Sequence, residues 1–260
     1  MTILDIIIEN KKKEIKDSKK LISLEQLSAS KYYYRQCLNF ADSIRNKNGI
    51  ISEFKRKSPS KGIINGEVFV VDVVKGYEDA EVSAISVLTD TVFFGGTFND
   101  VLLARETVAV PILRKDFMVD EYQLHEAKAM GADVILLIAS GLSKLQSQDL
   151  SGKAKELGLN VFLEIHNDRE LTYIEKNIDV VGVNNRDLKT FKVDIENAIR
   201  LAQQIPNHLP KVAESGISSP EMLLTMKSKG FTGFLIGENF MKTNNPGLAC
   251  KKFAKACNAK

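Results

Sequence analysis

The sequence has few cysteines, no long apolar segment and little net charge. Its 260 residues include only Cys37, Cys250 and Cys257, and none of these belongs to a CxxC pair. An odd number of cysteines without such spacing argues against a disulfide framework and suits a reducing compartment. No apolar stretch reaches the roughly 18 residues that a membrane helix needs. The formal net charge of +3 is too small to imply a nucleic-acid partner.

The first residues, MTILDIIIENKKKEIKD, lack the pattern of a signal peptide. Their apolar run precedes the lysines, and no small-residue cleavage site follows, so we expect a cytoplasmic protein. The lysine-rich segment 11–20 is open to two interpretations, a nucleic-acid patch or the solvated face of a helix. Apolar residues with helical spacing flank and interrupt it: Ile7, Ile8, Ile15 and Leu21. This spacing favours the solvated face of an N-terminal helix.

Motifs for metals, dinucleotides and catalytic triads are also missing. The three histidines, His125, His166 and His208, form no HxH or HExxH spacing. No GxGxxG follows an early strand, and no Ser/His/Asp order or activated cysteine is evident. We therefore expect neither a metal nor a cofactor, and we expect His166 to be a loop residue.

From Ile50 onward, short β-branched runs alternate with longer amphipathic stretches. Strands are predicted at 49–54, 84–88, 110–115, 133–139, 160–165, 179–184, 210–215 and 233–237. Helices are predicted at 67–79, 97–107, 119–130, 142–157, 168–176, 194–204, 218–229 and roughly 246–257. The strands are nearly all apolar, which is typical of parallel strands covered on both faces. Eight strand–helix units predict an α/β fold, a (β/α)8 TIM barrel, with a doubly wound open sheet as the alternative.

Residues 1–45 precede the first predicted strand. We expect them to form a helical extension of a single barrel domain, 1–260, because no linker or low-complexity segment interrupts the chain. A lid over the substrate is our hypothesis for this extension.

Polar residues stand at the ends of several predicted strands, where the active site of such a barrel lies. They are Glu53, Lys55, Lys115, Glu164, Asn184, Glu214 and Ser215, and the last predicted strand ends at Gly237. One glutamate or lysine at a strand end is more often a rim residue or part of a structural ion pair. Here three carboxylates and two amines would meet at one mouth, and such groups shift one another's pKa values.

Glycines follow the last two strands, in ESG and IGE. Gly216 and Gly237 lie where the backbone can approach a ligand, and these two loops commonly bind phosphate in such barrels. Glu238 is an awkward neighbour for a phosphate. We expect its side chain to turn away and its backbone N–H to help.

Several segments together resemble the indole-3-glycerol phosphate synthase family. In order, they are SEFKRKSPSKG, VLTDTVFFGG, PILRKDFMVDEYQLHEAKAMGADVILLI, LEIHN, VGVNNRDLKTF, VAESGI and FLIGENFM. The resemblance covers all eight predicted strands and the N-terminal extension, and KRKSPSKG with LRKDF and NNRDL is its most specific part. It implies conversion of 1-(2-carboxyphenylamino)-1-deoxyribulose 5-phosphate to indole-3-glycerol phosphate, a carboxy-lyase step of tryptophan biosynthesis that needs no cofactor.

The resemblance also implies roles for the charged strand-end residues. Lys115 would be the general acid at the ketone, since a lysine is protonated at neutral pH. Glu164 would be the base for the loss of water. Lys55 would be a second acid or a phosphate contact, and Glu53 would orient Lys55 and the substrate.

The remaining site residues follow from the same resemblance. Asn184, Glu214 and Ser215 would hold substrate hydroxyls and the lysines, and Gly216, Gly237 and the Glu238 amide would cradle the phosphate. Pro59, Phe94 and Phe117 would contact the aromatic ring, although core packing is the usual role of a phenylalanine. Ser58 and Arg186 are candidates for the substrate carboxylate, to which arginine is well suited.

Other functions stay open at this point. They include another phosphate-binding barrel such as phosphoribosylanthranilate isomerase, a Schiff-base aldolase using Lys115, a non-catalytic barrel, and a nucleic-acid binder using the N-terminal lysines. The KRKSP and LRKDF segments argue against the isomerase. We expect a phosphorylated aryl-amino ketose as substrate, no nucleic-acid or membrane partner, and a monofunctional monomer.

Overall fold

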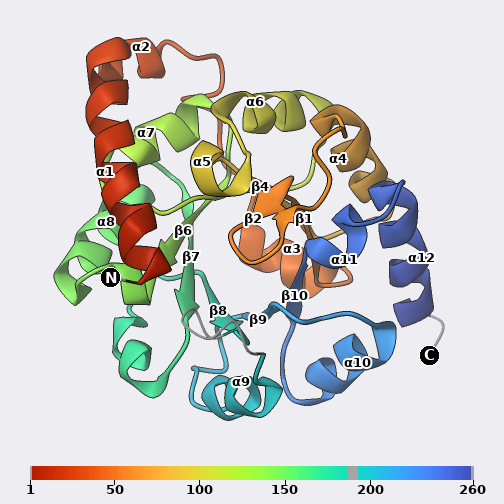
Figure 1. The fold of residues 1–260 in the computed structure, drawn as a ribbon. Helices are drawn as coiled ribbons and strands as arrows, with labels where there is room; N and C mark the ends of the chain where they lie inside the picture. Colours follow the sequence, from red (N-terminus) through yellow and green to blue (C-terminus); the bar gives the residue numbers. More distant parts are fainter. Residues whose placement is uncertain (1, 187–192, 259–260) are drawn as a thin grey trace.

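A closed barrel of parallel strands forms the centre of the molecule (Figure 1). The structure is a computed structural model that describes residues 2–186 and 193–258, so residues 187–191 of the VGVNNRDLKTF segment lie outside it. The strands follow one another around the barrel in the order β1-β10-β9-β8-β7-β6-β5-β4, and β4 pairs with β1. Their bounds are β1 Ile50–Phe54, β4 Ala84–Leu88, β5 Ile112–Lys115, β6 Val134–Ile138, β7 Asn160–Ile165, β8 Val180–Asn184, β9 Lys211–Glu214 and β10 Gly233–Ile236. The predicted (β/α)8 barrel is confirmed.

The strands are apolar because both of their faces are buried. Along β6, Val134, Leu136 and Ile138 belong to the cluster inside the barrel. Ile135 and Leu137, between them, belong to the cluster that includes buried residues of the surrounding helices. A strand with two buried faces has no polar side to show, which explains the continuous apolar runs of the sequence.

Helices surround the barrel. They are α4 Val70–Glu78, α6 Phe98–Thr107, α7 Tyr122–Ala129, α8 Lys144–Glu156, α9 Ile195–Ala202, α10 Pro220–Ser228 and α12 Pro246–Asn258. The predicted helix at 168–176 is instead a 3-10 segment, η2 (Asp168–Tyr173). Short elements that the sequence did not predict also occur: β2 Lys57–Ser58, β3 Gly62–Ile63, α5 Thr91–Phe94, η1 Ala139–Gly141 and α11 Glu238–Met241. No helix among the described residues is both long and apolar enough to span a bilayer.

Three helices precede the barrel: α1 Ile3–Leu21, α2 Leu24–Ser28 and α3 Phe40–Asn46. The first two lie beside α7 on the outside (Figure 1). At the other end of this segment, α3 closes the bottom of the barrel, where Phe40 is fully buried and packs against Phe162 of β7 with ring centroids 5.8 Å apart. The extension therefore contacts both the side and the bottom of the barrel.

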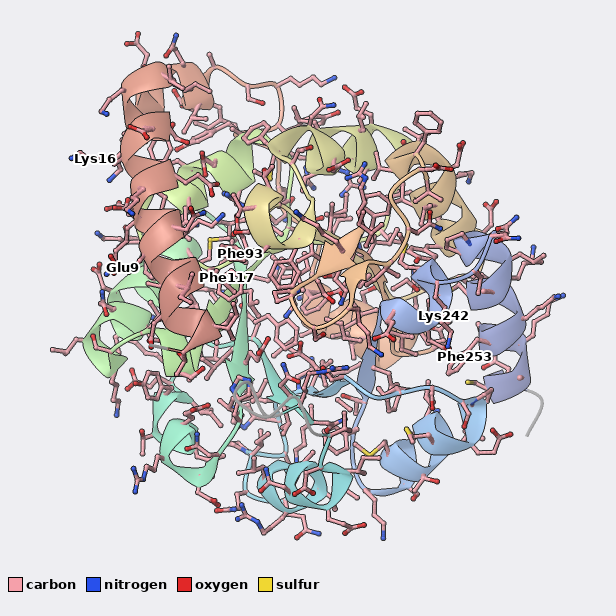
Figure 2. The ribbon with its side chains drawn as sticks, viewed as in Figure 1. Glu9, Lys16, Phe93, Phe117, Lys242 and Phe253 are labelled. Atoms are coloured by element: carbon pink, nitrogen blue, oxygen red, sulfur yellow. The ribbon has the colours of Figure 1, made fainter. Side chains whose placement is uncertain are left out.

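The buried stripe of α1 differs from the predicted one. Leu21 is 77% exposed, whereas Lys11 is 1% exposed and lies in the stripe with Ile7 and Ile15. Exposed lysines such as Lys16 project away from the barrel (Figure 2). The solvated-face interpretation is thus right for most of the lysines and wrong for Lys11.

Candidate active site

A cavity of about 390 Å³ opens at the carboxyl ends of the barrel strands. Strand pairing places polar residues level with one another around it, because Asn184 of β8 pairs with Glu214 of β9. Every residue that the sequence suggested for the site lines this cavity: Glu53, Lys55, Ser58, Pro59, Phe94, Lys115, Phe117, Glu164, Asn184, Arg186, Glu214, Ser215, Gly216, Gly237 and Glu238. The volume suits a small-molecule ligand.

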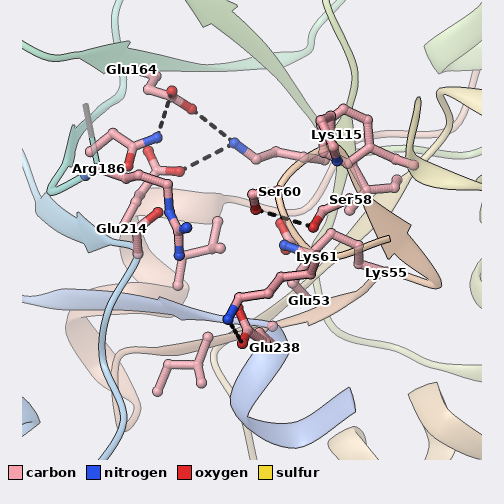
Figure 3. Close-up of a pocket in the computed structure, with 18 of the residues that line it drawn as sticks. Glu53, Lys55, Ser58, Ser60, Lys61, Lys115, Glu164, Arg186, Glu214 and Glu238 are labelled. Carbon is pink, nitrogen blue, oxygen red and sulfur yellow. Dashed lines mark hydrogen bonds and ion pairs between the residues drawn. The ribbon is translucent and has the colours of Figure 1, made fainter. Parts of the chain in front are cut away.

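Lys115, at the end of β5, lies between two carboxylates (Figure 3). Its Nζ is 2.9 Å from Glu164 Oε2 and 3.2 Å from Glu214 Oε2. Burial disfavours the ammonium, but the charges of Glu164, Glu214 and Glu53 outweigh this effect and raise the pKa of Lys115 well above its usual value. The side chain is therefore a fixed cation in the middle of the cavity wall.

The two carboxyl groups beside Lys115 differ in acidity. The pKa of Glu214 rises to about 8 because burial and the nearby negative charge of Glu164 outweigh the attraction of Lys115. Burial also opposes ionisation of Glu164, but Lys115, His166 and Asn184 overcome it and lower the pKa of that carboxyl. The two groups share one cation, so near neutral pH one holds a proton and the other is ionised.

A second ion pair forms at the end of β1, between Glu53, which precedes Phe54 in the sequence, and Lys55, which follows it. Lys55 Nζ donates a hydrogen bond to Glu53 Oε1 at 2.6 Å. Glu53 is 3% exposed, and its other oxygen accepts a long hydrogen bond of 3.5 Å from Ser86 of β4. The prediction that Glu53 orients Lys55 agrees with this geometry.

Two glycines, Gly182 in β8 and Gly237 just after β10, leave room for the buried carboxylates. A Cβ at Gly182 of β8 would collide with Glu214 Oε1 and the ring of Phe162, and one at Gly237 would lie 2.5 Å from Glu53 Oε1. Gly237 thus has a steric reason to be glycine in addition to the predicted phosphate contact.

His166 lies in the loop after β7, as the sequence suggested, and it contacts the site residue Glu164 although it does not line the cavity. Its Nε2 lies 3.2 Å from Glu164 Oε1, and its Nδ1 lies 3.4 Å from Glu170 Oε2. Burial disfavours the imidazolium, but the two carboxylates outweigh it and raise the pKa of His166 to about 10. Glu164 therefore has a cation on each side. The position just past a strand end was the signal in the sequence that could have identified His166.

Asn184, the last residue of β8, links Glu164 to the next segment. Its Nδ2 donates to Glu164 Oε1 at 2.9 Å, and its Oδ1 accepts the Arg186 N–H at 3.0 Å. Figure 3 shows the Arg186 side chain extending into the cavity. One asparagine thus orients the carboxylate and fixes the backbone that carries the arginine.

The turn after β9 has an unusual backbone. Ser215 and Gly216 have φ of 66° and 78°, and the Ser215 carbonyl accepts a hydrogen bond of 2.7 Å from Asn185. A serine in the left-handed region is strained, and such strain is typical of ligand-binding turns. Glu238, which follows β10, lies with its carboxylate 3.5 Å from Lys61 Nζ at the cavity rim, so a neighbouring cation balances its charge.

An apolar slot lies on the side of the cavity that faces α1. The rings of Phe94 and Phe117 are 5.9 Å apart and tilted by 38°. Pro59 lines the same cavity, and so do Leu4 and Ile7 of α1, which the sequence analysis did not assign to the site. The N-terminal helix therefore supplies part of the cavity wall. Over residues 2–186 and 193–258, no group of three or more His, Cys, Asp or Glu is placed to hold a metal ion.

Comparison with known proteins supports one family. The family model described as indole-3-glycerol phosphate synthase matches residues 4–253. An indole-3-glycerol phosphate synthase of Bacteroides thetaiotaomicron is 49% identical over 260 residues, which cover 98% of each chain. One from Caldanaerobacter subterraneus is 43% identical over 255 residues, covering 97% of this chain and 98% of the relative.

Solved structures are similar in fold at much lower sequence identity. Tryptophan synthase subunit alpha from Legionella pneumophila has a TM-score of 0.64 at 12% identity, covering 86% of this chain and 100% of that one. The 3-hexulose-6-phosphate synthase from Salmonella typhimurium has a TM-score of 0.63 at 14% identity, covering 81% and 99%. Likeness at this level of identity supports the barrel fold alone.

Proposed function

The chain belongs to the indole-3-glycerol phosphate synthase family, and we propose that Lys115, Glu164 and Lys55 are the acid–base groups of its reaction. The enzyme is a carboxy-lyase of tryptophan biosynthesis. It converts 1-(2-carboxyphenylamino)-1-deoxyribulose 5-phosphate to indole-3-glycerol phosphate, with release of carbon dioxide and water.

The observation that supports the residue assignment is the position of Lys115 between Glu164 and Glu214. In the ring closure, the aromatic carbon that bears the carboxylate attacks the ketone carbon. The ketone oxygen gains negative charge and must take a proton, and an ammonium within the cavity wall can donate it. Because Glu214 holds a proton near neutral pH, Lys115 has one full counter-ion, Glu164, and is less tightly bound than between two ionised carboxylates.

Loss of carbon dioxide returns the electrons of the broken bond to the ring system. The new hydroxyl then leaves as water, which needs one acid and one base. Glu164 is ionised and is assigned to remove the proton from the adjacent ring carbon. Lys55, held by Glu53 at 2.6 Å, is assigned to protonate the departing hydroxyl.

The rest of the substrate is assigned to the two sides of the cavity. The loops after β9 and β10, with Gly216, Gly237 and the Glu238 amide, are proposed to hold the phosphate. On the opposite side, Phe94 and Phe117 are proposed to hold the aromatic ring. Two further groups that line the cavity, the Arg186 guanidinium and the Ser58 hydroxyl, are assigned to the substrate carboxylate.

Two of the alternatives are weakened by the geometry. A Schiff-base aldolase needs a neutral lysine amine, and the raised pKa of Lys115 disfavours that form. A nucleic-acid binder needs an exposed basic patch. In the lysine-rich segment Lys11 is buried, and the exposed Lys12, Lys19 and Lys20 each pair with an acidic side chain.

The assignment is tested by turnover of the carboxyphenylamino ketose phosphate, followed by the indole fluorescence of the product. We expect activity in the wild type and a loss of about 10³-fold or more in Lys115→Ala, because a general acid and its electrostatic stabilisation are removed together. Lys144→Ala, at an exposed lysine of α8, is the matched control and should keep full activity. Near-normal turnover of folded Lys115→Ala would refute the role of this lysine. Trapping of an adduct by borohydride would favour the Schiff-base alternative.

We further propose a monomeric, cytoplasmic enzyme in which residues 1–260 form one domain. The burial of Phe40 of the extension against Phe162 of the barrel supports the single domain. One cooperative unfolding transition and a monomer mass by light scattering are the expected results.

A further inference from the structure

A buried lysine connects the N-terminal helix to the walls of the aromatic slot. Lys11 Nζ lies 3.1 Å from Asp90 Oδ2 and 2.9 Å from Asp116 Oδ1, and also 2.9 Å from Glu14 Oε2 on its own helix. The Lys11 side chain is 1% exposed, and the two aspartates are fully buried. Burial of three charges is costly, and removal of the cation alone would leave two carboxylates facing each other.

Each aspartate also fixes the backbone of a slot residue. Asp90 follows β4, and its Oδ1 accepts the Phe93 N–H at 2.7 Å, which caps the short helix α5 that ends with Phe94. Asp116 follows Lys115, and its Oδ1 accepts the Phe117 N–H at 2.8 Å. The same two carboxylates therefore hold the segments that carry both phenylalanines.

The two aspartates differ in how strongly they depend on Lys11. Asp116 Oδ2 also binds Thr89 at 2.6 Å and Arg114 at 3.1 Å, so it keeps partners without the lysine. Asp90 Oδ2 accepts no hydrogen bond from the described residues, and its ion pair is with Lys11. Without Lys11, Asp90 would be the group that moves, and α5 with Phe94 would move with it.

The same face of α1 closes the slot. Ile7 precedes Lys11 by one turn and Leu4 by about two, so all three side chains lie on one side of the helix, and Leu4 and Ile7 line the cavity. The lysine thus fixes the helix whose apolar residues complete the wall.

We propose that Lys11 is a positioning residue for the aromatic ring of the substrate, because it sets the distance between the segments that carry Phe94 and Phe117. This proposal rests on the proposed function, in which these two residues form the ring slot. It predicts a specific loss of recognition of the ring, whereas recognition of the sugar phosphate is retained.

The test compares two probes by calorimetry. One is the borohydride-reduced substrate, which keeps the carboxyphenylamino group and cannot react, and the other is ribulose 5-phosphate, which lacks the ring. The dissociation constant of ribulose 5-phosphate divided by that of the reduced substrate measures ring recognition. Lys11→Met keeps the side-chain stem without the charge, Lys11→Arg keeps the charge, and Lys12→Met is the control at an exposed lysine paired with Glu9 on the same helix.

We expect the ratio to fall about tenfold or more in Lys11→Met, because small displacements in a binding site have effects of this size. We expect KM to rise more than kcat falls, partial recovery in Lys11→Arg, and no change in Lys12→Met. An unchanged ratio in Lys11→Met, or an equal loss for both probes, would overturn the proposal. If the wild type binds both probes equally well, the assignment of Phe94 and Phe117 to the aromatic ring is wrong, and this outcome refutes the proposed function of the slot rather than the role of Lys11 within it.

A variant with balanced charges keeps the test decisive if Lys11→Met does not fold. Lys11→Met with Asp90→Asn removes one charge of each sign, and asparagine remains a good cap for α5. The expected result is the same loss of ring recognition in a folded protein. A wild-type ratio in this double variant would also overturn the proposal.

Discussion

Charged side chains are buried at both ends of the barrel, but with different surroundings. At the bottom, Asp133 is fully buried and accepts four bonds: from Arg35 Nη2 at 2.6 Å, the Leu38 N–H at 2.8 Å, Arg105 Nη1 at 3.0 Å and the Ile112 N–H at 2.9 Å. At the mouth, Glu214 is equally buried, yet its Oε1 has no hydrogen-bond partner in the described part of the chain.

This difference in hydrogen bonding indicates that the two buried carboxyl groups have different roles, one in stability and one in the reaction. A buried carboxylate with all of its acceptor positions used is a fixed structural group, and at the bottom it joins the segment before α3 to β5 and β6. A carboxyl with an unused oxygen and a raised pKa is free to bind or release a proton. We infer that the bottom network stabilises the barrel and that the mouth retains unsatisfied groups for the reaction.

The largest effect is expected at the mouth, in Glu164→Gln. Loss of the base should reduce turnover by about 10³-fold. Stability should change little, because without the negative charge of Glu164 the Glu214 carboxyl can ionise and become the counter-ion of Lys115. Turnover and urea unfolding measured on the same sample separate the two effects. Glu156→Gln, on the outer surface at the end of α8, is the control. Normal turnover of folded Glu164→Gln would assign the base elsewhere, with Glu53 as the next candidate.

Asp133→Asn should show the opposite pattern. It leaves Arg35 and Arg105 without their counter-ion, so we expect a loss of about 3–5 kcal/mol in the free energy of unfolding. Turnover per folded molecule should not change, because these residues are at the other end of the barrel. The comparison variant is Asp149→Asn, whose side chain on α8 is 62% exposed and should cost little. A large fall in turnover of folded Asp133→Asn would contradict the inference that the bottom network serves stability alone.

The smallest effect concerns pH and Glu214→Gln. In the folded protein the pKa of Glu214 rises from 4.5 to about 8. The native state therefore holds a proton that the unfolded state releases, so wild-type stability should fall as the pH rises from about 4.5 through about 8. Glutamine does not titrate, and this loss should be absent in the variant.

The measurement for Glu214→Gln is urea unfolding at pH 5 and pH 9. The stability of the variant minus that of the wild type should be higher at pH 9 than at pH 5, by on the order of 4 kcal/mol. A change in wild-type turnover near pH 8 should also be absent from the pH profile of the variant. Parallel pH curves for the two proteins would show that Glu214 does not hold the proton.

The sequence was informative about the barrel for a physical reason. All eight barrel strands lie within a residue or two of the predicted ranges, because doubly buried strands are continuous apolar runs. The short helices α5 and α11 were not predicted, since four residues contain too little periodicity to detect. The predicted helix at 168–176 has a capping asparagine, Asn167, but forms a 3-10 segment.

The site was predictable as a set because the barrel topology brings strand ends together. Individual roles were harder, since a side chain's environment depends on distant partners. Lys11 was assigned to a solvated face, and its burial follows from Asp90 and Asp116, about 80 and 105 positions later in the chain. His166 is different, because both of its carboxylate neighbours, Glu164 and Glu170, are close to it in sequence, and only the structure shows that the three side chains turn toward one another.

The position of the extension has a consequence for synthesis on the ribosome. Phe40 of α3 binds Asn160, 120 positions later, and β1 completes its pairing only with β10, for example Ile50 with Phe234. Residues 40–50 therefore wait for strands that are made much later before they find their partners. Contacts of such sequence separation slow folding, and the apolar face of α3 is exposed during translation. We therefore expect the apolar face of α3 to need protection from aggregation until the later barrel strands have been made.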